Sequence, residues 1–78
     1  MTLVTWTDHA TCMVWYAVEE APDVKIGIPE EALVAERDVG HVVMRALAVL
    51  RDELRGQSGE CVLTAGEVRT LALLPENP

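Results

Sequence analysis

Residues 38–55, DVGHVVMRALAVLRDELR, decide the fold of this chain. Apolar side chains recur there every three or four positions, which is the period of a helix that buries one face. The apolar stripe comprises Val39, Val42, Val43, Ala46, Leu47, Val49, Leu50 and Leu54. The polar face comprises His41, Arg45, Arg51, Asp52 and Arg55. The pattern predicts one long amphipathic helix packed against a hydrophobic core.

Both ends of this predicted helix carry suitable terminal residues. Asp38 is a favourable N-cap, because its carboxylate can accept hydrogen bonds from the first free backbone amides. Arg51 and Arg55 lie in the last turns, where positive charge complements the helix dipole. Gly56 follows them and predicts the end of the helix.

The residues before the helix alternate between the two faces of predicted strands. Residues 3–7 form a first strand, and Asp8-His9-Ala10 forms a turn. Residues 11–18 form the strongest strand, which is apolar on both faces. In residues 24–28, Val24, Ile26 and Ile28 point inward, as in a half-buried strand. Residues 29–35 remain open between a helical turn after Pro29 and a short strand over 32–35.

The residues after the helix predict a hairpin. Residues 60–64 and 67–74 form its strands, and Ala65-Gly66 forms its turn. The resulting order is ββ(β)–α–ββ within a single domain spanning residues 1–78. We therefore expect an α+β two-layer sandwich, in which one long helix covers one face of an antiparallel sheet of four to five strands.

The doubly apolar strand has a further consequence. Only one face of the sheet can meet the helix in a two-layer domain, so the other face requires cover from loops, another subunit or another protein. Met13, Trp15 and Tyr16 lie on this strand and Trp6 on the preceding one, and these residue types are frequent anchors at protein interfaces. The alternative, that both tryptophans fill the protein's own core, remains open.

The chain is acidic, with a formal net charge of −7 over 78 residues. Its first 36 residues hold seven acidic side chains and one basic side chain, Lys25. Such a field repels phosphate backbones and anionic lipids, so we expect neither direct nucleic-acid binding nor membrane binding. It attracts a basic protein surface, although solubility alone also accounts for acidity.

Catalytic and metal-binding patterns are weak. His9 and Cys12 do not form a standard zinc-ligand pair, and no second close pair follows them. Ser58 lies in a loop that leads from a helix into a strand, which is the reverse of a nucleophile elbow. Cys12 and Cys61 lie in apolar runs, where we expect buried, unreactive thiols. We therefore expect no enzymatic activity, no metal and no cofactor.

The cysteines and the N-terminal residues bear on the compartment. Two cysteines in separate apolar runs are typical of a cytosolic protein with reduced thiols, although a Cys12–Cys61 disulfide is an alternative. The N-terminal residues lack a basic segment, and Asp8 interrupts their apolar stretch, so we expect no signal peptide. No apolar run approaches the length of a membrane span. We expect a cytoplasmic protein.

These observations favour a small acidic protein that acts by binding another protein and forms a homodimer. Inhibitors, immunity or antitoxin proteins and phage anti-defence proteins belong to this class, including those that cover a basic nucleic-acid-binding surface. One alternative is an oligomeric small-molecule-binding or enzymatic domain with an interface pocket near His9, Tyr16 or Glu19-Glu20. Another is a structural subunit of a larger assembly. The predicted partner-binding residues are Trp6, Asp8, Met13, Trp15, Glu19, Glu20, Asp23, Glu30 and Glu31.

Overall fold

Three consecutive strands at the start of the chain form an antiparallel meander, and a fourth strand joins it after the long helix. The computed structural model describes residues 2–34 and 36–74. It contains a four-stranded sheet in the order β1-β2-β3-β4. The elements are β1 (Leu3–Asp8), β2 (Met13–Val18), β3 (Ala21–Pro29), α1 (Glu30–Val34), α2 (Val39–Leu54), β4 (Gly59–Val62) and α3 (Ala65–Leu73).

Helix α2 confirms the central prediction of the sequence. The Asp38 carboxylate accepts a hydrogen bond from the His41 amide at 3.2 Å and so caps the first turn. At the other end, Arg55 adopts the left-handed conformation and its amide donates to the Arg51 carbonyl at 3.1 Å. Gly56 follows with a φ of +90°, a conformation that glycine adopts without strain.

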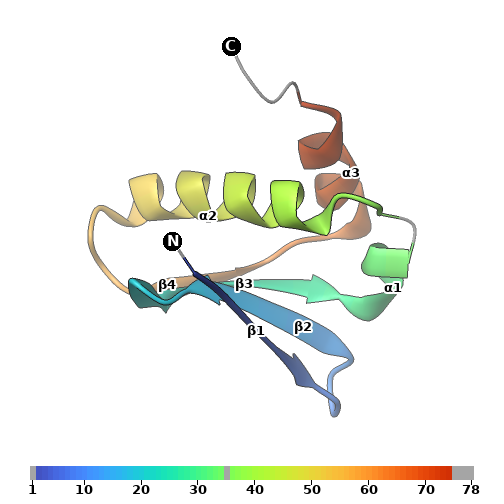
Figure 1. Ribbon diagram of the computed structural model, residues 1–78, viewed down its shortest axis with the longest axis horizontal. Coiled ribbons are helices and arrows are strands. Elements are labelled where there is room, and N and C mark those ends of the chain that lie inside the picture. Colours follow the sequence, from blue (N-terminus) through green and yellow to red (C-terminus); the bar gives the residue numbers. More distant parts are fainter. Residues whose placement is uncertain (1, 35, 75–78) are drawn as a thin grey trace.

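The sheet is mixed, and in this respect the prediction of an antiparallel sheet was wrong. Strand β4 runs parallel to β3, with Ile26 opposite Cys61 and Gly27 opposite Val62. Parallel neighbours need a crossover connection, and α2 provides it. The helices lie on one side of the sheet, so the architecture is α+β with two layers (Figure 1).

The hydrophobic core lies between α2 and the β2–β3 part of the sheet. Val24, Ile26 and Ile28 all point inward, as their alternation predicts. Val42 and Leu47 of α2 cover them. The remaining buried core residues are Tyr16, Val18, Ala32, Val43, Ala46, Leu63 and Val68.

Helix α1 resolves the segment that the sequence left open. Glu30 and Glu31 occupy its first turn, directly after Pro29, where acidic side chains complement the helix dipole. Ala32 is buried and joins the core. The alternative strand over 32–35 is therefore wrong for residues 32–34, and residue 35 lies outside the described residues.

The predicted C-terminal hairpin is also wrong, because α3 replaces its second strand. The Thr64 hydroxyl accepts from the Glu67 amide at 3.2 Å, and the Glu67 carboxylate accepts from the Thr64 amide at 2.9 Å. This reciprocal pair is a capping box, which starts a helix. Leu63 and Val68 then attach the segment to the core. The described residues thus contain three helices, whereas the sequence predicted one long helix.

Two smaller corrections concern the edges of predicted elements. Val49 was assigned to the buried stripe of α2, yet 54% of its surface is exposed. Strand β2 begins at Met13, because Cys12 adopts a φ of 56° and belongs to the preceding turn. No helix in the described part of the chain combines the length and apolarity that a membrane span needs.

Candidate functional site

The side of the sheet that faces away from the helices carries a row of large side chains. Trp6 of β1 lies opposite Trp15 of β2, and Trp15 lies opposite Gly27 of β3. Val62 of β4 completes the row, because it pairs with Gly27. Paired residues share a face of the sheet, so these side chains form one continuous surface.

Gly27 permits the central feature of this row. A Cβ atom at position 27 would lie 2.9 Å from Cζ3 and 3.0 Å from Cη2 of Trp15. The indole ring therefore lies against the bare backbone of β3, which leaves Trp15 half-buried and Gly27 buried. A side chain on residue 27 would push the ring away from the sheet.

Apolar side chains continue the row towards both ends of the strands. Met13 pairs with Pro29 at one end, and Val4 pairs with Ala17 at the other. We call the surface that these residues form the open face. It comprises the buried residues Ala17 and Gly27 at its base and the exposed or half-buried side chains of Val4, Trp6, Met13, Trp15, Pro29 and Val62.

Charged residues border the open face. Asp8 pairs with Met13 at one end, and its carboxylate accepts a hydrogen bond from the Ala10 amide at 3.1 Å. Lys25 and Glu60 pair with each other near the other end. An apolar centre with polar groups at its margin is the arrangement found in protein interfaces.

No described element covers the open face, because α1, α2 and α3 all lie on the other side of the sheet (Figure 1). Trp6 is 40% exposed, and Val62 is 48% exposed. The sequence left open whether both tryptophans fill the protein's own core. Neither belongs to the core cluster, and Trp15 is only half-buried.

The structure divides the predicted partner-binding residues into groups. Trp6, Asp8, Met13 and Trp15 come together on one surface. The exposed acidic residues lie instead at the two ends of the sheet. Glu19, Glu20 and Asp23 lie near the β2–β3 turn, whereas Glu30 and Glu31 begin α1 at the far end of β3. The acidic field thus flanks the open face from two directions.

Sequence reasoning missed five residues of the open face: Val4, Ala17, Gly27, Pro29 and Val62. The signal for Gly27 was a glycine inside an otherwise regular strand, which often marks a close approach of another group. The other four could be found only from the register, since nothing in their local sequence separates them from core residues.

The residues considered for catalysis or metal binding stay apart. Cys12 and Cys61 are free thiols, and Cys12 is exposed, so the expected burial was wrong for that residue. Within the described residues, no group of three or more His, Cys, Asp or Glu side chains is placed to hold a metal ion. His9 and Glu20 lie in turns at opposite ends of β2, so one chain does not bring them into a common pocket.

The phenol of Tyr16 has a perturbed acidity. It faces the helices and is almost fully buried. Burial raises the pKa of its phenol above the usual value, and a side-chain hydrogen bond with Thr5 partly opposes that rise. The phenol lies within the core cluster, where burial favours its neutral form.

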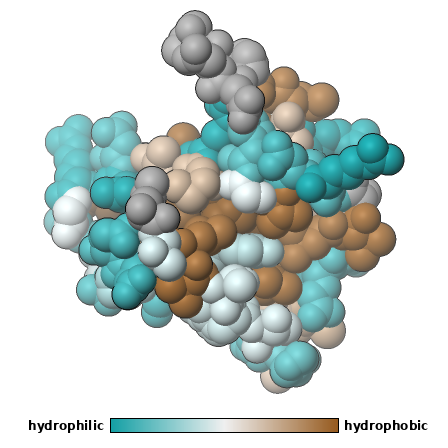
Figure 2. Space-filling model, in the orientation of Figure 1, coloured by the Kyte–Doolittle hydropathy of each residue, from teal (hydrophilic) through white to brown (hydrophobic). Residues whose placement is uncertain are grey.

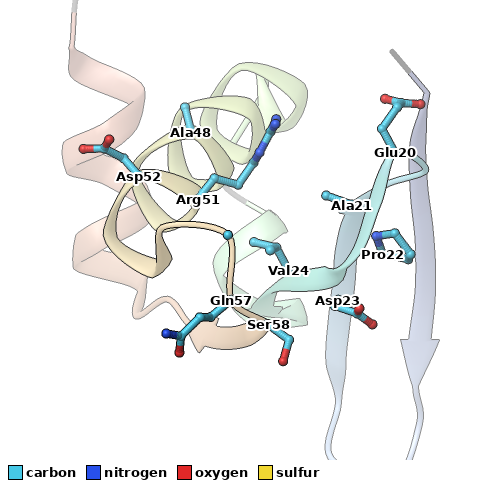
Figure 3. A pocket seen from close by; sticks show the side chains of 11 residues that line it. Glu20, Ala21, Pro22, Asp23, Val24, Ala48, Arg51, Asp52, Gln57 and Ser58 are labelled. Carbon is cyan, nitrogen blue, oxygen red and sulfur yellow. The ribbon is translucent and has the colours of Figure 1, made fainter.

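A surface hollow lies at the C-terminal end of α2, beside the β2–β3 turn. Its volume is about 680 Å³, and its lining includes Glu20, Asp23, Arg51 and Ser58. Figure 3 shows Arg51 on the side of α2 that faces the turn and Asp52 on the opposite side. The hollow is open, and its lining mixes both signs of charge.

Comparisons with known proteins give no relative from which a function could be inferred. No family model matches the chain, and no curated protein or solved structure matches it either. The observations that bear on function are therefore the apolar row, its charged margin and the acidic ends of the sheet.

Proposed function

We propose that this protein acts by binding another protein through the open face. The single observation that supports this most strongly is the row of Trp6, Trp15 and Gly27, which presents two indole rings on a surface without cover from the described elements. Tryptophan is among the residues that contribute most to binding energy at protein interfaces.

The shape of the row favours a protein partner over a small ligand. Its members spread over four strands and form a broad, shallow surface. Small molecules prefer concave sites that enclose most of their surface. A broad surface with a central aromatic anchor suits the flat interfaces that proteins form with one another.

The charge of the chain indicates what the partner presents. The net charge is −7, and exposed carboxylates lie at both ends of the sheet. The best complement is an apolar patch flanked by Lys or Arg side chains. We therefore place the protein among small inhibitors of the immunity, antitoxin or phage anti-defence type. Covering a basic nucleic-acid-binding surface is one way in which it would act.

The same proposal leaves the protein without enzymatic activity, cofactor or direct contact with nucleic acid. Its negative charge opposes phosphate binding, so any effect on nucleic acid passes through the protein partner. The compartment in this proposal is the cytoplasm, where the free thiols of Cys12 and Cys61 stay reduced.

The test compares two charge substitutions on opposite sides of the molecule. Trp15→Lys places a cation at the centre of the open face, whereas Val49→Lys places one on the exposed surface of α2. Proteins captured from host lysate are quantified for each variant, and the affinity of the purified partner is then measured by calorimetry. We expect Trp15→Lys to weaken binding about 30-fold, which corresponds to a loss of about 2 kcal/mol.

Val49→Lys is expected to leave the affinity unchanged, and circular dichroism verifies that both variants are folded. Raising the ionic strength is expected to weaken binding of the unmodified protein, because part of the attraction is between charges. Equal affinity of the two variants for the partner would contradict the proposal.

A further inference from the structure

Strand β1 is an edge strand that the rest of the fold leaves uncovered. All six of its residues are exposed, and its substantial contacts are with β2. Leu3, Val4 and Trp6 are 38%, 41% and 40% exposed, so apolar surface appears on both faces of the strand. White and brown residues gather over the β1–β2 ribbon, low in the centre of Figure 2. A two-stranded ribbon with so little support is marginally stable on its own.

The features that usually protect an edge strand from pairing are missing from β1. It contains no proline, lysine or arginine, and its register with β2 runs through six residues without a bulge. Its one charged residue, Asp8, lies at its end. Natural proteins block exposed edges with such residues and irregularities, so an unprotected edge indicates that another strand pairs there.

The hydrogen bonds of β1 show which backbone groups are available. The Thr2 carbonyl accepts from the Glu19 amide at 2.8 Å, so the polar groups of residue 2 point towards β2. The direction of the backbone N–H and C=O groups alternates from one residue to the next along a strand. The backbone groups of residues 4, 6 and 8 therefore also point towards β2. The amides and carbonyls of Leu3, Thr5 and Thr7 therefore point outward, along the edge.

We propose that two copies of this chain pair antiparallel through their β1 edges, with Thr5 on the two-fold axis. Antiparallel pairing requires outward groups opposite outward groups, which allows only registers that place odd-numbered residues opposite odd-numbered residues. Centring on Thr5 puts Leu3 of each copy opposite Thr7 of the other. Among the allowed symmetric registers, this one alone pairs all three outward residues of β1, namely Leu3, Thr5 and Thr7, with one another.

The side chains are self-complementary in the same register. On the open face, Val4 of each copy lies opposite Trp6 of the other, in a pair without backbone hydrogen bonds, where side chains approach closely. Aromatic and β-branched residues are favourable cross-strand partners. The two Thr5 side chains meet on the helix side of the sheet.

Charge also favours a second copy as the occupant. Asp8 of one copy lies opposite Thr2 of the other, so no carboxylate of β1 meets another across the pair. The other acidic residues among the first 36 lie away from the β1 edge: Glu19 and Glu20 in the β2–β3 turn, Asp23 in β3, Glu30 and Glu31 in α1, and Glu36 after α1. Because the one charge of β1 lies at its end, the edge has no particular preference for a basic peptide, and its pairing with a second copy brings no two carboxylates of β1 together.

The dimer has an eight-stranded sheet in which the two open faces become one. Trp15 and Trp6 of one copy continue into Val4 and Trp6 of the other, so the apolar row doubles in length. This symmetric interface does not depend on the proposed binding of a different protein, although it would present two binding surfaces to a partner and so raise avidity.

The first test measures mass by analytical ultracentrifugation over a wide range of protein concentrations. Thr5→Pro removes an outward amide but no backbone hydrogen bond to β2, so it blocks the dimer while the backbone pairing of β1 with β2 remains. It also removes the side-chain hydrogen bond between Thr5 and Tyr16, which the control Thr5→Val removes as well. We expect the dimer dissociation constant to rise by at least about tenfold. Thr5→Val keeps the amide and the branched shape, and it is expected to dimerise like the unmodified protein.

The second test reads the register with cysteine cross-links, in a background of Cys12→Ser and Cys61→Ser. Two Thr5→Cys residues would lie about 5.5 Å apart between Cα atoms, within the range that a disulfide spans. Oxidised glutathione accepts the two electrons and two protons of the thiols, giving two reduced glutathione molecules and the cross-linked dimer. Thr7→Cys residues would lie about 14 Å apart and are expected to stay unlinked.

Each outcome supports or overturns the inference. A monomer at all concentrations, with no Thr5→Cys cross-link, overturns it and leaves β1 to a strand from a different protein. A dimer that survives Thr5→Pro shows that copies associate through another surface. Equal cross-linking of Thr5→Cys and Thr7→Cys overturns the register. Because Trp15→Lys tests partner binding and Thr5→Pro tests the dimer, the two proposals fail separately.

Discussion

The β3–β4 half of the sheet and the β1–β2 ribbon differ in how their apolar residues are used. Ile26 and Ile28 of β3 are 1% and 0% exposed beneath α2, whereas Val4 and Trp6 of β1 are 41% and 40% exposed. Both halves have strand-forming, apolar sequences. The difference teaches that this chain encodes more apolar surface than one layer of helices covers, and the surplus lies on one ribbon and one face.

Removing core volume is expected to have the largest effect on this comparison. Ile28→Ala leaves a cavity beneath α2 and should lower the free energy of unfolding by about 2–5 kcal/mol. Val4→Ala removes a comparable group from the ribbon and should cost well under half as much. Urea unfolding followed by circular dichroism measures both.

Ile28→Val serves as the milder core variant if Ile28→Ala does not fold, with an expected cost of about 0.5–1.5 kcal/mol. Equal costs for Ile28→Ala and Val4→Ala, or a cost of Val4→Ala more than twice that of Ile28→Val, would show that β1 is as well packed as β3, and the comparison would then break down.

Crowding the open face at its centre should have the next largest effect. Gly27→Ala brings a methyl group within 2.9 Å of the Trp15 ring, which must move. We expect a loss of about 1–3 kcal/mol in the free energy of unfolding. In a Trp15→Ala background the added methyl group meets open space, so the same substitution should cost much less. An additive double-mutant cycle would argue against the contact.

Loss of the α3 capping box should have a smaller effect. Thr64→Ala removes the acceptor for the Glu67 amide, so we expect a loss of about 1 kcal/mol in the free energy of unfolding. Thr70→Ala, on the exposed side of the same helix, is the matched control and should change stability less. Equal effects of the two substitutions would show that the cap contributes nothing specific.

The smallest expected effect is the pH dependence of stability that Tyr16 causes. Tyr16 lies on β2, between β1 and β3. Burial raises the pKa of Tyr16 in the folded protein, so the folded state holds its proton more tightly than the unfolded state. This contribution to stability is complete below a pH of about 10 and is lost as the pH rises through the raised pKa. Tyr16→Phe should remove that alkaline loss.

Tyr16 is the only tyrosine, so its ultraviolet absorbance during an alkaline titration reports its ionisation directly. A midpoint at or below the ordinary value would contradict the burial of this side chain against the core. Urea unfolding of the Tyr16→Phe variant at the same pH values provides the control for other titrating groups.

Part of this structure could be predicted because local signals and tertiary packing agreed. The spacing of Val42, Val43, Ala46 and Leu47 predicted the buried face of α2, and Asp38 predicted its start. The alternation of Val24, Ile26 and Ile28 predicted β3. Apolar periodicity predicts such elements well, because each buries its apolar face against the other.

Other parts were wrong although the sequence carried a signal. Thr64 and Glu67 have the spacing of a capping box, and that spacing favours a helix over the predicted strand. A strand, a helix of four turns and a second strand are typical of a parallel crossover, which the prediction of an antiparallel sheet overlooked. In both cases the alternation of apolar residues favoured a hairpin, whereas the capping residues and the order of the elements favoured the observed structure.

By itself, the sequence determined the long helix, the three strands that precede it, the acidic charge and the presence of more apolar surface than one face can hide. Only the tertiary structure decided which tryptophans face outward, that Gly27 receives the Trp15 ring, and that β1 forms an open edge. The physical reason is that periodicity indicates whether a helix or strand has an apolar face. The pairing register and the position of the helices then decide whether that face meets the core or the surface.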